Sequence, residues 1–135
     1  MTGLAERVER LRSISLFSSL DDEALGLVAS VAVDVDIPAG RVITEPKQPG
    51  SGMFAIEDGR AEVQLRGGAT RGLGPGDCFG ELALLTREAQ RTARVFARTD
   101  LRCLAIARED FLYLLEREPQ IAIVLLETLA GRLAR

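Results

Sequence analysis

The sequence contains no histidine and no tryptophan, and aromatic residues make up only 4% of it. Without histidine the chain cannot build a Ser-His-Asp or Cys-His catalytic group, a histidine-ligated zinc site or a cupin-type metal site. So few aromatic side chains also argue against a surface that stacks the bases of single-stranded nucleic acid. These absences point away from histidine-dependent enzymes and from single-strand binding.

Cysteine, long apolar runs and excess positive charge are also scarce. Cys78 and Cys103 are too few and too far apart for a metal cluster or a disulfide framework, so we expect reduced thiols in a cytoplasmic protein. The N-terminus is charged where a signal peptide needs an apolar run, and the longest apolar stretch, 121–126, is too short to span or insert into a membrane. The net charge of -3 argues against nucleic acid binding by these residues.

What is present fits a single domain of 135 residues, 47% of them hydrophobic. Helical periodicity predicts N-terminal helices over about 2–30, with Asp21 as an N-cap, and C-terminal helices over about 108–135, the last restarting at Pro119. From Val31 the period changes to the alternation of a half-buried strand, and short strands with glycine-rich turns continue to about 107. We expect hairpins at Asp58-Gly59 and around Thr99-Asp100.

Many short strands between helical ends indicate a mainly β fold, a small roll with flanking helices. The final helix is apolar on nearly every side between Ile121 and Leu126. One side can cover the roll, and the other needs a partner, which could be a ligand, a second subunit or a further domain. A plain core helix is the alternative interpretation.

The segment 79–95 carries the residues best suited to binding a ligand. Gly80 permits close approach of the backbone, and Glu81 can accept hydrogen bonds from sugar hydroxyls. The following apolar residues, 82–85, suggest one helical turn whose first N–H groups would point at an anion. Arg91 is a fork-shaped donor suited to phosphate, and Thr92 adds a hydroxyl beside it. The pattern predicts a site for a phosphorylated sugar.

This segment resembles the phosphate-binding cassette of the cyclic nucleotide-binding domain family. The family pattern is Gly-Glu followed by apolar and small residues, then a loop and Arg-(Ser/Thr/Ala)-Ala, and every position is filled here. The resemblance extends to Leu16–Leu20, to Ile37–Gly40, to Gly59 and to Gly76–Phe79. It implies a double-stranded β-helix, a jelly-roll-like β-roll, with N-terminal helices and C-terminal lid helices.

The resemblance also implies roles for individual residues. Glu81 would bind the ribose 2′-hydroxyl, Arg91 the cyclic phosphate, and Thr92 the phosphate or a guanine amine. The remaining ligand-binding positions would be the backbone amides of Gly80, Leu82 and Ala93, their neighbour Ala83, the apolar residues Val63 and Leu73 beside the base, and Arg132 on the last helix. Lys47 stands where the family usually has glycine, and Arg71 stands where an apolar base contact is common.

The favoured hypothesis is therefore a regulatory domain for cAMP or cGMP, without catalysis or a metal, that signals through its last helix to an effector domain or a homodimer. One rival is a domain of the same fold that has lost the nucleotide and serves only as an interaction or dimerisation module. In that case Glu81 and Arg91 would form no more than a structural salt bridge. Another is the sensor half of a transcription regulator whose DNA-binding domain lies outside these residues.

Overall fold

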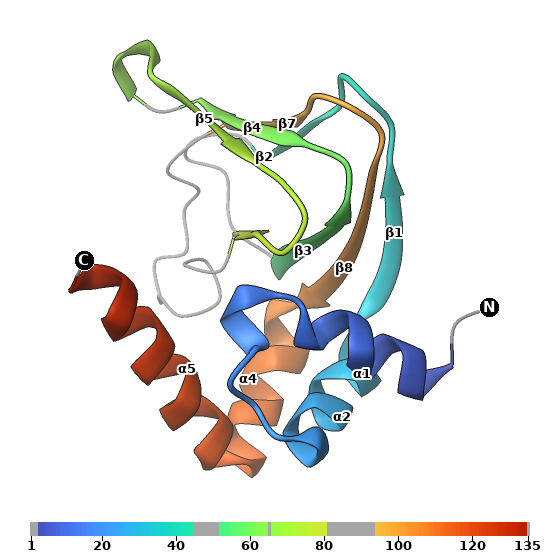
Figure 1. Ribbon diagram of the computed structural model, residues 1–135, viewed down its shortest axis with the longest axis vertical. Helices are drawn as coiled ribbons and strands as arrows, with labels where there is room; N and C mark the ends of the chain where they lie inside the picture. Colours follow the sequence, from blue (N-terminus) through green and yellow to red (C-terminus); the bar gives the residue numbers. More distant parts are fainter. Residues whose placement is uncertain (1–2, 45–51, 65, 81–93, 135) are drawn as a thin grey trace.

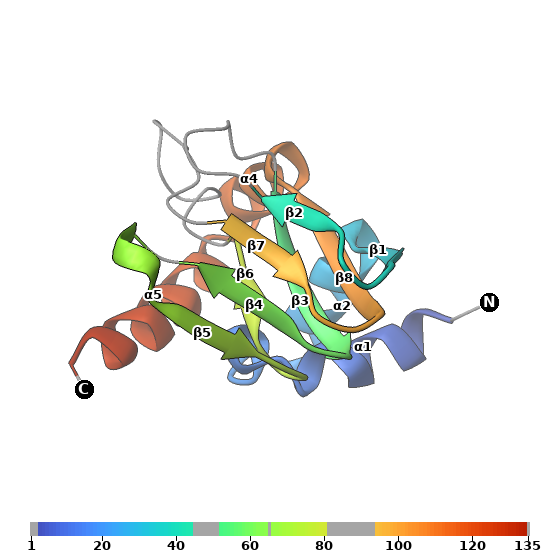
Figure 2. The ribbon, with the colours of Figure 1, turned by 90° about the horizontal axis from the view of Figure 1, so that it is seen from above.

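The computed structural model describes residues 3–44, 52–64, 66–80 and 94–134 (Figure 1). Within these ranges, eight strands form two four-stranded antiparallel sheets, in the orders β1-β8-β3-β6 and β2-β7-β4-β5. The strands of the first sheet are β1 (Val33–Ile37), β8 (Leu101–Ala107), β3 (Gly52–Asp58) and β6 (Cys78–Phe79). Those of the second are β2 (Val42–Thr44), β7 (Arg94–Ala97), β4 (Ala61–Gln64) and β5 (Thr70–Leu73). Figure 2 shows the second sheet lying across the first. This arrangement confirms the predicted fold, a mainly β roll with flanking helices.

The two turns expected to form hairpins are corners, at which the chain passes from one sheet to the other. β3 and β4 lie in different sheets, as do β7 and β8, so the hairpin predictions at Asp58-Gly59 and Thr99-Asp100 are wrong. The two corners instead bond to each other: the Arg98 N–H donates to the Arg60 carbonyl at 2.9 Å, and the Arg60 N–H donates to the Thr99 hydroxyl at 3.0 Å. A Cβ on Gly59, at φ +94°, would stand 2.2 Å from the Asp100 carbonyl oxygen, so the crossing requires glycine.

Helices cover one end of the roll. They are α1 (Leu4–Arg12), the 3-10 turn η1 (Ser15–Phe17), α2 (Asp22–Val31), α4 (Arg108–Arg117) and α5 (Pro119–Leu133). The predicted N-cap is confirmed, since the Asp21 carboxylate accepts from the Ala24 N–H at 2.8 Å. Val31 is the last residue of α2 rather than the start of a strand, because the extended backbone begins at Ala32.

The sheet β1-β8-β3-β6 separates two apolar clusters. On the helix side, the buried side chains Met53, Ala55, Leu104 and Ile106 pack with those of α1, η1, α2, α4 and α5. On the other side, inside the roll, a smaller cluster holds Ile37, Ile56, Ala61, Val63, Leu73, Phe79, Val95, Ala97, Leu101 and Cys103. The roll interior is therefore lined by both sheets, while the helices are held on the outer face of only one.

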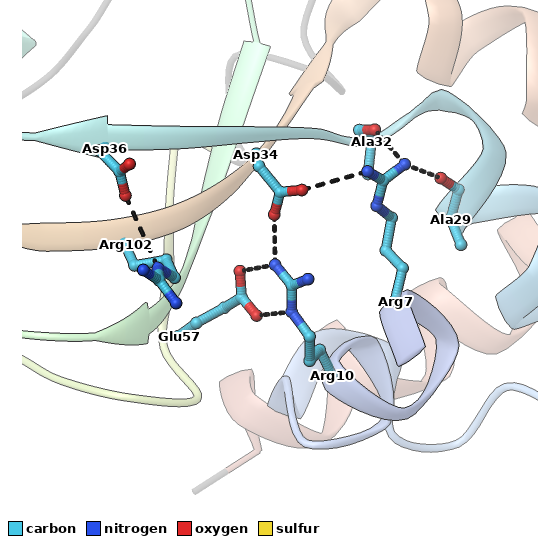
Figure 3. Close-up of polar contacts among 8 residues, drawn as sticks. All are labelled: Arg7, Arg10, Ala29, Ala32, Asp34, Asp36, Glu57 and Arg102. Carbon is cyan, nitrogen blue, oxygen red and sulfur yellow. Dashed lines mark hydrogen bonds and ion pairs between the residues drawn. The ribbon is translucent and has the colours of Figure 1, made fainter. Parts of the chain in front are cut away.

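Charged side chains fasten α1 to the outer face of that sheet (Figure 3). The Arg10 guanidinium donates to both carboxylate oxygens of Glu57 on β3 and to Asp34 on β1. Arg7 donates to Asp34 at 3.2 Å and to the carbonyls of Ala29 and Ala32, at 3.3 and 3.0 Å, at the end of α2. We call Arg7, Arg10, Asp34 and Glu57 the α1 clamp. The hydrogen bond to Glu57 contributes most to raising the pKa of Arg10 above its ordinary value.

The two cysteines are thiols, as predicted, but differ in burial: Cys103 faces the roll interior, and Cys78 is half-buried toward the helices. Burial, with the negative charges of Glu57 and Asp36 adding to it, raises the pKa of Cys103 to about 12. At pH 8 its thiolate fraction is then very small, so we expect Cys103 in the folded protein to react with a disulfide reagent at least about 100-fold more slowly than an exposed thiol.

The same shift predicts a pH dependence of stability. The folded state keeps the Cys103 proton up to about pH 12, whereas the unfolded thiol, with an ordinary value of 9.0, loses it earlier. The contribution is complete below pH 9 and is lost as the pH rises from 9 toward 12. Urea unfolding of the wild type and of Cys103→Ala over this range measures it, and equal pH slopes for the two proteins would contradict the assignment.

Candidate ligand-binding site

The two predicted base contacts, Val63 and Leu73, lie on neighbouring strands of the second sheet. In the register of β4 with β5, Leu73 faces Ala61 and Val63 faces Arg71. Both Val63 and Leu73 are 7% exposed and belong to the inner cluster, whereas Arg71 is exposed. The structure thus places the apolar pair on the inner wall of the roll, where a flat aromatic ring could pack.

Phe79 joins this inner wall directly before the predicted cassette. Its ring stacks on that of Phe54, with centroids 5.1 Å apart and planes at 16°. It is 5% exposed and belongs to the same inner cluster as Val63 and Leu73. Its neighbour along the chain is Gly80, so the chain leads directly from the apolar wall to the start of the cassette.

Gly80 has a left-handed backbone conformation, with φ +83°. This region strongly favours glycine, because a Cβ would clash with the backbone there. The predicted requirement for glycine is thus explained by the bend at the end of β6 as well as by any close approach of a ligand. A side chain at this position would strain the segment that leads into residue 81.

The turn before β6 holds the cassette entrance to the rest of the molecule. The Asp77 carboxylate accepts from the Gly74 N–H at 2.9 Å, and the Asp77 carbonyl accepts from the Ile56 N–H at 2.8 Å. Gly76, at φ +94°, donates to the Ile56 carbonyl at 2.9 Å and accepts from the Ser15 N–H at 3.0 Å. In the sequence, Gly76 and Asp77 indicate only a family resemblance. Their observed role is to fix this turn between β3 and η1.

The other predicted ligand contacts are not tested by this geometry. Glu81, Leu82, Ala83, Arg91, Thr92 and Ala93 lie outside the described residues, as does Lys47. Arg132 lies on α5, and its side chain is outside the description. What the structure does bring together is the inner wall, Gly80 and the turn 74–77.

A separate hollow of about 530 Å³ lies at the strand ends where the corners meet, lined by Asp36, Ile37, Pro38, Asp58, Asp100, Leu101 and Arg102. Its charged groups are engaged locally: Asp36 lies 3.7 Å from Arg102, and Asp100 accepts from the Ala39 N–H at 2.9 Å. None of the predicted ligand contacts lines this hollow. It is therefore distinct from the predicted ligand contacts, although Ile37 and Leu101 of the inner cluster also line it.

Comparison with known proteins decides the family. Residues 34–118 match the family model described as "Cyclic nucleotide-binding domain". The chain belongs to the cyclic nucleotide-binding domain family. The match includes the inner wall, Gly80 and the whole motif from Glu81 to Ala93, so the family resemblance suggested by the sequence is confirmed.

Three relatives of this cyclic nucleotide-binding domain show how widely it is used. Glutaminase 2 of Bradyrhizobium diazoefficiens is 31% identical over 122 residues, which are 90% of this chain and 19% of that protein. The cyclic AMP receptor protein of Thermus thermophilus is 34% identical over 128 residues, 91% of this chain and 59% of that protein. The regulatory domain of Toxoplasma gondii PKA, crystallised with cAMP, superimposes with a TM-score of 0.70 at 29% identity, covering 82% of this chain and 44% of that one.

The domain spans about a fifth of the glutaminase and about three fifths of the receptor protein. Its relatives therefore share a region similar to this domain in otherwise different proteins. Among the described residues, no helix is long and apolar enough to cross a membrane.

Proposed function

We propose that this domain binds cAMP or cGMP through residues 80–93 and passes occupancy through α5 to an effector domain or to a second subunit. The family match over residues 34–118, with an unbroken Gly80-Glu81 and Arg91-Thr92-Ala93 motif inside it, carries the proposal. No catalytic step and no metal ion are assigned to the domain itself. A cytoplasmic location completes the proposal, since thiol cysteines suit a reducing compartment.

The proposed contacts divide the ligand between polar and apolar groups. Glu81 accepts from the ribose 2′-hydroxyl, and Arg91 with Thr92 binds the cyclic phosphate through charge-assisted and hydroxyl hydrogen bonds. The backbone amides of Gly80, Leu82 and Ala93, beside Ala83, complete the anion site. Val63 and Leu73 pack against the base, and Arg132 approaches it from α5. The buried inner wall that ends at Gly80 supports this division, because it offers an apolar surface beside the polar motif.

The C-terminal helices support the coupling to a partner. Ile121 and Leu125 of α5 are buried, at 0% and 3% exposure, against the helix-side cluster. Ile123 and Leu126 on the same helix are 57% and 63% exposed, so α5 is apolar on two sides and covered on one. An uncovered apolar side on the helix proposed to carry the signal suits docking of an effector or a second subunit.

Titration calorimetry tests the ligand. We expect heat of binding for cAMP and for cGMP, with cAMP bound somewhat more tightly, because the relatives compared above are cAMP proteins in two cases out of three. The preference should be small, since Thr92 suits either base. The matched control is 5′-AMP, which has the same base and ribose but lacks the cyclic phosphodiester. Absence of heat for both cyclic nucleotides at millimolar concentration, with nucleotide-free protein, would overturn the proposed function.

A further inference from the structure

The α1 clamp fixes the end of α1 to two strands of the roll. Glu57 has a side chain only 10% exposed and Arg10 one 24% exposed, so their ion pair is largely removed from water. Arg10 stands in the last turn of α1 and contacts both β3 and β1, while Arg7 links the same sheet to the end of α2. A largely buried pair of this kind holds its two elements in one arrangement more firmly than an exposed pair.

The chain runs directly from the clamp into η1. The Ser13 N–H donates to the Arg10 carbonyl at 3.2 Å, and the Ile14 N–H donates to the Leu11 carbonyl at 3.0 Å. Ile14 is fully buried, and the Ser15 N–H donates to Gly76 in the turn before the cassette. The position of η1 is therefore set from one side by the clamp and from the other by the turn 74–77.

η1 in turn packs against α5. The main contacts of α5 with the described elements are with α4 and η1. The buried Leu16 and Phe17 of η1 belong to the same cluster as Ile121 and Leu125 of α5. Figure 1 shows α5 at the periphery, beside α4 and away from the strands of the roll. Besides the proposed direct contact of Arg132 with the base, a ligand in the roll can bias α5 through elements whose arrangement differs between the two states of the helix.

We propose that Arg10 is a positioning residue. Through Glu57 and Asp34 it holds η1 in a fixed position on the roll, so that the response of α5 to nucleotide depends on the clamp. This inference rests on the proposed function. Among the described elements, α5 packs mainly against α4 and η1, and the clamp holds η1 on the roll. Loss of the clamp therefore weakens the response of α5 and leaves nucleotide binding at the roll in place.

The test variant is the double substitution Arg10→Gln/Glu57→Gln. It removes both charges together, so no uncompensated buried charge remains to unfold the domain. The matched control is Arg12→Gln/Asp22→Asn. Arg12 lies two residues further along the same helix and pairs with Glu9 and with Asp22 on α2, so the control removes an ion pair of α1 that does not reach the roll.

Hydrogen exchange with and without saturating cAMP gives the readout. In the wild type and the control, we expect cAMP to slow the amides of Phe79 and Gly80 and those of residues 120–133, the latter by roughly 5- to 150-fold, which is the usual range of coupling between sites. In the double variant, Phe79 and Gly80 should respond as before, while the slowing over 120–133 falls at least about threefold. The quantity compared is the ratio of the exchange rate without cAMP to the rate with cAMP, which we call the protection ratio. A merely structural role would change both rates by the same factor and leave the protection ratio unaltered.

The inference is overturned if cAMP still slows Phe79 and Gly80 in the double variant and the protection ratio over 120–133 equals that of the wild type. The proposed function would then remain intact. Absence of calorimetric binding in the wild type instead overturns the proposed function. If the double variant does not fold, Asp34→Asn decides. Asp34 has a side chain 39% exposed, and this change removes one partner of each clamp arginine while keeping the Arg10–Glu57 pair. In Asp34→Asn, the protection ratio over 120–133 must then fall below that of the Arg12→Gln/Asp22→Asn control. A protection ratio equal to that of the control counts against the proposal.

Discussion

Replacing Arg91 with alanine is expected to weaken cAMP binding by about 2–4 kcal/mol, roughly 30- to 700-fold. The proposed site offers the cyclic phosphate one guanidinium, and its loss leaves the anion with hydroxyl and amide donors alone. Glu81→Ala should cost less, about 1–3 kcal/mol, because it removes a charged acceptor from a neutral hydroxyl rather than a counter-charge from an anion. Calorimetry or displacement of a fluorescent cAMP analogue measures both changes.

The matched control for this loss is Arg98→Ala. Arg98 lies at the corner after β7, has a side chain 63% exposed and pairs with Glu62 at 3.1 Å, so its removal changes the net charge equally without touching the inner wall. Its dissociation constant should stay within about a factor of three of the wild type. Small and equal effects for Arg91→Ala, Glu81→Ala and Arg98→Ala would show that cAMP binds elsewhere.

Replacing Arg10 with alanine is expected to lower the free energy of unfolding by about 3 kcal/mol. Removing one partner of a buried ion pair typically costs 3–5 kcal/mol, since it leaves the other charge buried and uncompensated. Glu57, with a side chain 10% exposed, would be that charge, and the residual exposure of Arg10 puts the expected loss at the low end of the range. Urea unfolding with linear extrapolation measures it.

Two comparisons separate this effect from a general loss of helix. Arg12→Ala removes ion pairs that lie at the surface and should change the unfolding midpoint little. The double variant Arg10→Met/Glu57→Met leaves no buried charge and should recover most of the lost stability. If the double variant is as unstable as Arg10→Ala, the loss comes from α1 packing, and the ion pair is not its cause.

Local chemistry explains which parts of the fold could be predicted from the sequence. The Asp21 cap and the restart at Pro119 depend on neighbours in the chain, and both occur where expected. The residues at Gly59 and Asp100 predict hairpins because they are those of a tight turn. Only the partner strands, which are distant in sequence, decide that each corner passes from one sheet to the other.

In the candidate site, too, residues marked by a local motif could be predicted, and contacts between residues distant in sequence could not. The motif indicates Gly80, and the family resemblance implies Val63 and Leu73. The structure shows a left-handed bend at Gly80 and burial of the other two side chains. The clamp could not be foreseen, because Arg10 and Glu57 are separated by 47 residues and each resembles an ordinary charged residue of a solvated face. Pairing between distant charges leaves no local pattern in a single sequence.

The strand order of the first sheet also determines when the roll can form during synthesis. β1 and β3 both pair with β8, in registers that join Val33 to Ala105 and Gly52 to Ala107. Until β8 leaves the ribosome, both strands lack the central partner of their sheet, and their apolar faces depend on other contacts to stay out of water. Such distant pairings place folding in the slower range of milliseconds to seconds. β8 is therefore the strand that joins β1 to β3, and the sheet face against which the helices pack is complete only once β8 is in place.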